Sequence, residues 1–298
     1  MKSLRILVII VLAFTAFAGH MESHAATPRA EVPEFKVFCR MELSANEIYD
    51  GESVMARLVL YTPFDIQSIN ATDEPQFKGF ACRPTAVETS PSYTIVDGRQ
   101  YFAGVIKQWI LTPEKTGKRT VKGGTYKAVV LVPYLVERGF HSYYQNEAIE
   151  VTVTAEPVEV KVLKLPKGKP SGYKGAVGIF ENDVQLSSKV LTVGDEATLS
   201  YMINGLGNPG NLSTTDLVFP DGLTAEIIPE QSIDQVRLSG KSIVGTKCTV
   251  YKIKARKAGR HKVTIPAIVY FDPDSHEYQT IPERTIEIQA AYGEVYEM

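Results

Sequence analysis

Residues 205–210, with the sequence GLGNPG, have the glycine spacing of a dinucleotide-binding loop. Such a loop leads from a strand into a helix whose N-terminus holds the pyrophosphate. A strand-like pattern precedes the segment, but the residues after it lack a helical apolar period, and Pro209 lies within the turn. We therefore expect no bound cofactor, and instead a glycine-rich loop at the tip of a β-sandwich. Its Gly205, Gly207 and Asn208 are candidate contacts for a protein partner.

Aromatic side chains gather in a second segment, where Phe140, Tyr143 and Tyr144 accompany His141 just after a turn at residues 138–139. Aromatic rings beside a turn can stack on a sugar or contact a protein. The alternative is a tyrosine-rich strand with no binding role. Tyr143 and Tyr144 are therefore the other candidate binding residues.

An acidic segment, residues 272–277 with the sequence DPDSHE, offers carboxylate oxygens of the kind that bind calcium. A calcium loop of the EF-hand kind needs Gly at its sixth position, where this sequence has Glu277. The same residues are common in hairpin turns. We expect a hairpin turn and no metal site.

Motifs of nucleophilic or metal-dependent hydrolysis, GxSxG and HExxH, are missing from the sequence. The histidines beyond residue 26, which are His141, His261 and His276, are scattered. We therefore predict no catalytic residue and no enzymatic activity. A hydrolase with two carboxylates on distant loops stays open as an alternative.

The three cysteines are Cys39, Cys82 and Cys248, and no two have the CxxC spacing typical of a metal site. A disulfide between Cys39 and Cys82 is possible in an oxidising compartment. The alternative is that all three are small buried apolar side chains.

The N-terminus has the order of a secretory signal peptide. Lys2 and Arg5 precede an apolar run at residues 6–18, and small residues follow it. The run is shorter than the about 20 residues of a membrane-spanning helix, and an uncleaved anchor is the alternative. We predict a signal peptide at residues 1–26, an exported protein that is periplasmic or associated with the cell envelope, and no transmembrane helix in the mature chain. The net charge of −2 argues against a nucleic-acid partner.

The elements that would position these residues are strands. Apolar and polar residues alternate with period two at residues 35–42, 54–60, 149–153 and 158–162, and Gly and Pro punctuate the runs. Residues 54–60 recur about 143 positions later, and residues 109–121 about 142 positions later. The duplication predicts an all-β protein of two tandem Ig-like β-sandwich domains. We expect them at residues 27–165 and 166–290, with the boundary in a Pro- and Gly-rich linker at residues 166–172, and followed by a polar tail at residues 291–298.

Several segments resemble one known family. After a Leu-Pro linker come YKGAVGIF at residues 173–180, LTVGDEATL at residues 191–199 and GLGN at residues 205–208. This series resembles the BatD oxygen-tolerance, or aerotolerance, family. The first domain is similar through its Gly51-Glu52 turn and through Leu111-Thr112-Pro113. Longer members continue into a transmembrane helix, so the chain is similar to a short form without that part.

The resemblance implies an exported interaction or scaffold protein associated with oxygen tolerance or envelope stress. It implies protein partners of the von Willebrand A-type Bat class, encoded together with a MoxR-type ATPase. With no cofactor, metal or catalytic residue expected, we predict a non-enzymatic extracytoplasmic module. The alternative is a carbohydrate-binding or adhesin-like surface module.

Overall fold

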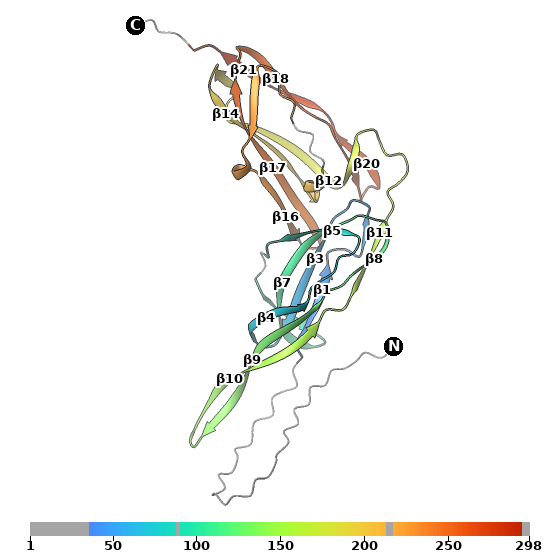
Figure 1. Ribbon diagram of the computed structural model, residues 1–298, viewed down its shortest axis with the longest axis vertical. Helices are drawn as coiled ribbons and strands as arrows, with labels where there is room; N and C mark the ends of the chain where they lie inside the picture. The colour runs from blue at the N-terminus through green and yellow to red at the C-terminus, as the bar shows by residue number, and fades with distance from the viewer. Residues whose placement is uncertain (1–35, 88–89, 213–216, 294–298) are drawn as a thin grey trace, which may run out of the picture.

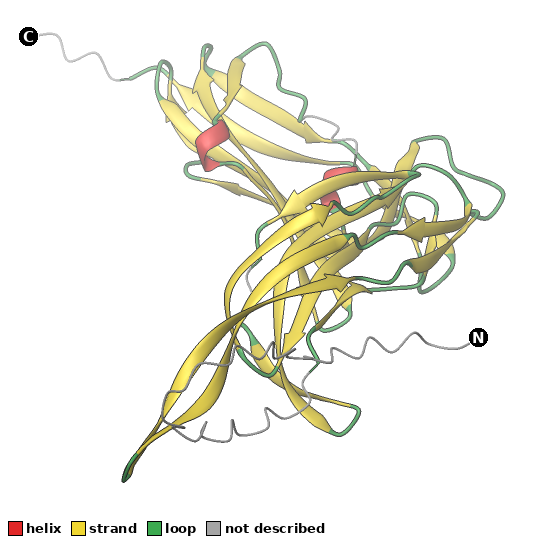
Figure 2. Cartoon of the chain, turned by 60° about the horizontal axis from the view of Figure 1, so that its bottom comes forward, coloured by secondary structure: helices red, strands yellow, loops and turns green. Residues whose placement is uncertain are grey.

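The computed structural model describes residues 36–87, 90–212 and 217–293, and it consists of two β-sandwiches joined end to end (Figure 1). Figure 2 shows that strands make up almost the whole of it, with two short helical turns. The predicted signal peptide lies outside the described residues, as do the last five positions of the predicted tail. Within the described part, no helix is long and apolar enough to cross a membrane.

The first sandwich packs one sheet against a layer of two smaller sheets. The first sheet has the order β1 (Phe38–Leu43), β3 (Val54–Thr62), β7 (Arg99–Pro113) and β5 (Phe80–Thr85), with β6 (Ser92–Val96) also paired to β7. The opposite layer contains β10 (His141–Thr154), β9 (Thr125–Arg138) and β4 (Asp65–Asp73), and beside them β2 (Glu47–Tyr49), β11 (Val158–Leu163) and β8 (Gly117–Val121). Their inward side chains, among them Leu58, Trp109 and Tyr126, form one core.

The second sandwich packs one larger sheet against one smaller sheet. Its larger sheet has the order β15 (Leu223–Ile227), β17 (Ser242–Ala255), β14 (Glu196–Gly207), β12 (Tyr173–Leu186), β19 (Ile268–Asp272) and β20 (Glu277–Ile281), with β16 (Ile233–Ser239) also paired to β17. The smaller sheet contains β13 (Val190–Thr192), β21 (Arg284–Ala291) and β18 (Gly259–Ile265). The helical turns are η1 (Pro209–Asn211) and η2 (Pro229–Gln231). Leu199, Ile253 and Ile288 lie at the centre of the core.

The sequence duplication corresponds to a duplicated strand pairing. Val54 pairs with Leu111 across β3 and β7, and Ala197 pairs with Ile253 across β14 and β17. In each sandwich the last strand also runs parallel to a short early strand, β11 with β2 and β21 with β13. On its other side it pairs antiparallel, β11 with β8 and β21 with β18. The predicted fold class of two tandem Ig-like sandwiches is confirmed.

Strand β3 departs from the simple alternation that its sequence suggests. Ala56, Leu58 and Leu60 face the core as expected, but Met55 and Val59 on the other face are also buried. Met55 is covered by the second sandwich, and Val59 lies in a satellite cluster with Tyr101. The face of β3 expected to be exposed to solvent is therefore buried by residues that do not belong to the core of the first sandwich.

Candidate interaction surfaces

The β9–β10 hairpin projects beyond the first sandwich, on the side away from the second (Figure 1). The two strands pair along their full length, from Thr125 with Thr154 to Arg138 with His141. Strand β4 pairs with β9 only as far as Leu131. Residues 132–147 therefore form a two-stranded extension, which we call the arm. At about 3.4 Å per residue, its paired positions reach roughly 24 Å beyond the third strand.

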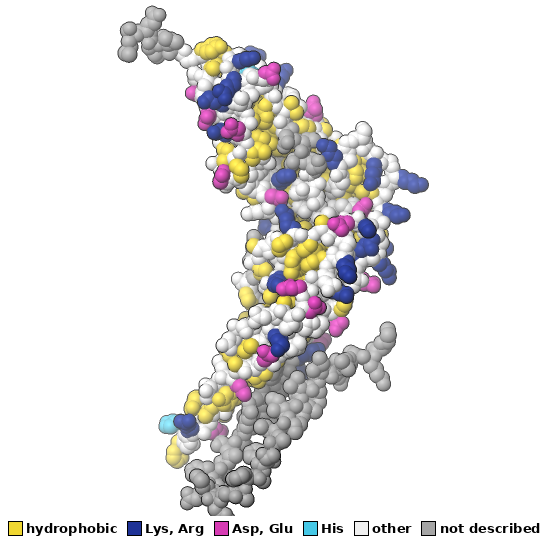
Figure 3. All heavy atoms as spheres, in the orientation of Figure 1, with side chains coloured by type: hydrophobic (Ala, Val, Ile, Leu, Met, Phe, Trp, Pro, Cys, Tyr) yellow, Lys and Arg dark blue, Asp and Glu magenta, His cyan; other side chains and the backbone are white. Residues whose placement is uncertain are grey.

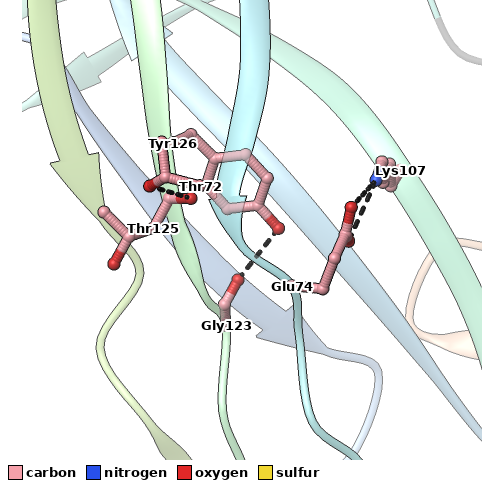
Figure 4. Close-up of polar contacts among 6 residues, drawn as sticks. All are labelled: Thr72, Glu74, Lys107, Gly123, Thr125 and Tyr126. Atoms are coloured by element: carbon pink, nitrogen blue, oxygen red, sulfur yellow. Dashed lines mark hydrogen bonds and ion pairs between the residues drawn. The ribbon is translucent and has the colours of Figure 1, made fainter.

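The start of β9, which leads into the arm, is fixed to the sandwich by buried and polar contacts (Figure 4). The Tyr126 hydroxyl donates to the Gly123 carbonyl at 3.1 Å, and the Thr72 hydroxyl donates to the Thr125 carbonyl at 3.1 Å. Burial raises the pKa of the Tyr126 hydroxyl, and the nearby carboxylate of Glu74 adds to the shift. A neutral, hydrogen-bonded tyrosine thus anchors the start of β9 in the core, six residues before the arm begins.

Aromatic side chains near the end of the arm are open to solvent. Phe140 in the turn is fully exposed, at 106% of its reference area, and Tyr144 is 76% exposed. Tyr143 is 45% exposed and pairs with Val136, whereas Tyr144 pairs with Leu135. Since neighbouring residues of a strand point to opposite faces, each face of the arm carries one tyrosine beside an aliphatic residue. Figure 3 shows apolar groups along the arm and at its end.

The exposed aromatic residues of the arm are better explained by a role in binding than by a contribution to folding stability. A two-stranded hairpin is marginally stable alone, and here Gly139, with φ of +58°, provides the tight turn that closes it. Exposed aromatic rings gain no core burial, and they mark contact surfaces when they cluster. The sequence-based candidates Tyr143 and Tyr144 are therefore both accessible near Phe140 at the end of the arm, on its two opposite faces.

The other candidates, Gly205, Gly207 and Asn208, are not in an exposed loop at a sandwich tip, and that expectation is wrong. Gly205 and Gly207 lie within the last three residues of β14, where they pair with Phe180 and Gly178 of β12. A Cβ atom on Gly205 would lie 2.0 Å from the Ile179 carbonyl oxygen, which explains the need for glycine. Asn208 is buried, with 6% exposure, and it faces the first sandwich. Of these three residues, Asn208 contacts the other domain of the same chain, whereas Gly205 and Gly207 pack within the second sandwich.

A polar network joins the two sandwiches at this point. The Asn211 side-chain amide donates to the Gly51 carbonyl at 3.2 Å and to the Ser53 hydroxyl at 3.0 Å. The Asn208 amide donates to the Ser53 hydroxyl at 3.3 Å and to the Asn211 side-chain oxygen at 3.1 Å. Ser53 is further bonded to the Thr112 hydroxyl at 2.8 Å. The network satisfies both amides in a largely water-excluded position.

Apolar and ionic contacts extend this joint. Met55 and Ile110, on the outer face of the first sandwich, pack against Val236 and Ile243 of the β16–β17 hairpin. Close to them Arg83 forms an ion pair with Asp234, with 3.2 Å between nitrogen and oxygen. Buried apolar surface stabilises association by about 25 cal/mol per Å². The joint therefore combines a dry centre with directional polar bonds.

A third part of the joint surrounds Tyr49 of β2. Its ring meets Phe271 edge to face, with 4.9 Å between centroids, and lies 5.9 Å from the His276 ring. The Tyr49 backbone N–H donates to the Glu52 carboxylate at 2.8 Å. Burial raises the pKa of Glu52; this hydrogen bond opposes the shift, and Asp274 across the joint adds to it.

The predicted hairpin turn at residues 272–277 connects β19 and β20. Asp272 accepts hydrogen bonds from the backbone N–H groups of Asp274 at 2.8 Å and Ser275 at 3.3 Å, which is ordinary turn chemistry. Among the described residues, no three His, Cys, Asp or Glu side chains group closely enough to hold a metal ion.

The possible disulfide between Cys39 and Cys82 is not formed, and both thiols are free. Cys39 lies on β1 and Cys82 on β5, with β3 and β7 between them in the sheet. Three strand spacings of about 4.8 Å separate them by at least roughly 14 Å, whereas a disulfide needs Cα atoms within about 7 Å. Burial raises the pKa of Cys39 to about 11, so its thiol stays protonated.

Sequence reasoning missed the residues of the first sandwich that form the joint, including Ser53, Ile110 and Thr112. Met55 and Ile110 read as ordinary outward positions of strands, and a lone serine or threonine carries no signal. Only the apolar character of the outward Met55 and Ile110 hinted that this face of the sheet is covered.

Comparison with known proteins places these features in context. No family model and no curated protein sequence matches the chain. Among solved structures, the D00-D0 domain of intimin matches at 11% identity over 86% of this chain and 97% of that chain, with a TM-score of 0.19. The adhesin InvE of Yersinia pseudotuberculosis matches at 8% identity over 85% of this chain and 58% of that chain, with a TM-score of 0.20. The type II cohesin dyad from the ScaA scaffoldin of Acetivibrio cellulolyticus matches at 10% identity over 87% and 98%, with a TM-score of 0.23. TM-scores this low do not define the fold, which is assigned from the strand pairing described above.

Proposed function

We propose that this chain is a non-enzymatic, extracytoplasmic interaction protein of the BatD type, and that the arm contacts its protein partner. The observation that carries the proposal is the exposure of Phe140 and Tyr144 at the end of an anchored hairpin. Aromatic residues dominate the energetic centres of protein interfaces because they bury a large rigid surface at a small entropic cost. The joint holds the second sandwich away from this surface, which leaves the arm free to bind.

The partner class in this proposal is the von Willebrand A-type Bat protein, in a system for tolerance of oxygen or envelope stress. The support is the series of segments at residues 173–180, 191–199 and 205–208, which resembles the BatD family. Those segments include the glycines that let β12 and β14 approach closely. They therefore support the fold of the second domain, while the arm supplies the contact surface.

A carbohydrate-binding or adhesin-like role is the second candidate, because the faces of Tyr143 and Tyr144 are also open to a sugar ring. Glycan-array binding by the wild-type chain that is lost in Tyr143→Ala would favour this role. A blank array would remove it.

Photo-crosslinking tests the protein-partner proposal directly. A photoreactive phenylalanine analogue replaces Tyr144 in one variant and Ile95, which is 74% exposed on β6 outside the arm, in a matched control. After irradiation of the native envelope, position 144 should yield an adduct with a von Willebrand A-type protein, and position 95 should not. Equal adducts at both positions, or none at position 144, would contradict the proposal.

A further inference from the structure

One side of the molecule carries a strong excess of positive charge. Residues 114–122 and 157–174 together contain nine Lys or Arg and two Glu, in a chain whose net charge is −2. The rest of the chain is therefore acidic overall. We call the surface formed by these two segments the basic surface.

The fold brings the two segments side by side. Strand β8 lies within the first segment and β11 within the second, and the two strands pair antiparallel from Val158 with Val121 to Val162 with Gly117. The chain then leaves β11 through the linker and enters β12. Figure 3 shows dark blue side chains gathered over β8, β11 and the neighbouring end of β20. The lysines of both segments are all exposed.

Most of this charge is not neutralised within the protein. Lys161 pairs with Glu47 at 2.5 Å, and Lys118 lies 3.8 Å from Glu159. Among the described residues, no carboxylate lies within ion-pair distance of the remaining six lysines, which are Lys115, Lys122, Lys164, Lys167, Lys169 and Lys174. Four of these six belong to the linker or its edge, where no acidic residue occurs. The positive potential is therefore directed outward.

The types of side chain on the basic surface indicate the class of ligand that it can bind. Eight of its nine basic residues are lysines, and the one arginine, Arg119, donates to the carbonyls of Lys115 and Thr116. Lysine acts as a hydrated point charge, whereas specific recognition of a single phosphate usually uses the guanidinium fork. Large exposed apolar side chains are confined to other parts of the described chain. Such a surface adsorbs to a fluid anionic layer without inserting into it.

We propose that the basic surface binds the anionic headgroups of a phospholipid membrane. Each lysine held near an anionic membrane strengthens binding by about fivefold, and the attraction weakens as salt screens it. The linker lysines, on a Pro- and Gly-rich segment, can each adjust to a headgroup. This surface is distinct from the arm, so the proposal does not depend on the proposed function.

Vesicle co-sedimentation of the mature chain tests this inference, with vesicles of phosphatidylcholine alone or of phosphatidylcholine and phosphatidylglycerol in equal parts. The test variant is Lys167→Gln with Lys169→Gln, in the exposed linker. The control is Lys189→Gln with Lys241→Gln, two exposed lysines of the second sandwich that change the net charge equally. We expect binding only to the anionic vesicles, roughly 30-fold weaker in the test variant and little changed in the control.

Three results would overturn the inference: no binding to anionic vesicles, equal weakening by both double variants, or binding that added salt does not reduce. A fourth would reassign the surface. If the chain does not bind vesicles but binds an acidic polysaccharide through Lys167 and Lys169, the ligand is a soluble or wall-bound polymer, and the assignment to lipid headgroups is wrong.

Discussion

Replacing Asn211 by alanine removes the side chain that donates across the joint to Gly51 and to Ser53, at 3.2 and 3.0 Å. A hydrogen bond of this kind contributes about 1 kcal/mol net. We therefore expect Asn211→Ala to weaken the coupling between the sandwiches by about 2 kcal/mol. For domains of this size the loss should lower the urea midpoint by about 1 M.

The assay uses the single tryptophan of the chain. Trp109 lies in the core of the first sandwich, with 8% exposure, so its fluorescence reports unfolding of that domain alone. A substitution in the second sandwich that shifts the Trp109 transition must act through the joint. Asn182→Ala is the control, because Asn182 bonds to Tyr201 within the second sandwich.

The wild-type chain should give coincident fluorescence and circular-dichroism transitions. Asn211→Ala should shift the Trp109 transition and separate it from the circular-dichroism transition, because it weakens the coupling between the sandwiches. Asn182→Ala weakens only the second sandwich and should leave the two probes coincident. If the two probes coincide but Asn211→Ala does not move the Trp109 transition, the reasoning about the joint is refuted.

Three further predictions concern single residues. Because the pKa of Glu52 is raised above its ordinary value of 4.5, ionising it costs folding free energy at neutral pH, and this cost disappears as the pH falls below 4.5. Glu52→Gln should therefore raise the free energy of unfolding at neutral pH with no gain in acid, as urea titrations across pH would show; a gain that is independent of pH would contradict it. Gly205→Ala should destabilise the second sandwich by about 3 kcal/mol in thermal unfolding, through the clash with the Ile179 carbonyl. The control Gly104→Ala, whose new methyl group would meet nothing closer than 3.9 Å, should have little effect, and equal losses would argue against the clash. In thiol labelling, Cys82 should react in the native chain while buried Cys39 and Cys248 react only after unfolding; protection of Cys82 would contradict the free, exposed thiol.

The sequence predicts the parts of this fold that depend on local pattern. Alternation marks strands such as β3 and β11, and the offset of about 143 residues anticipates the matching pairs of Val54 with Leu111 and Ala197 with Ile253. Tyr143 and Tyr144 are also found this way, because a turn signal beside them indicates an end of a hairpin. The length of the arm is less apparent, since it depends on where β4 stops pairing with β9.

The joint depends on how two separately folded bodies meet, and local pattern carries little of that information. Gly205 and Gly207 suggest a loop because glycine favours turns, yet here they allow backbone and Phe180 to approach closely. Asn208 suits a solvent-exposed turn equally well, and only the position of Ser53 on the other domain makes it a buried contact. Whether a surface residue of one domain is exposed or buried can be predicted only when the position of the other domain is known.

Affinity co-purification from the native envelope tests the proposed function most directly, with the wild-type mature chain compared against Phe140→Ser with Tyr144→Ser by quantitative mass spectrometry. Both side chains are exposed, so the double variant should fold with unchanged stability. The proposal predicts that von Willebrand A-type proteins accompany the wild-type chain and are strongly depleted from the variant. Recovery of those proteins equally by both chains, or of polysaccharide and surface glycoproteins in their place, would contradict it.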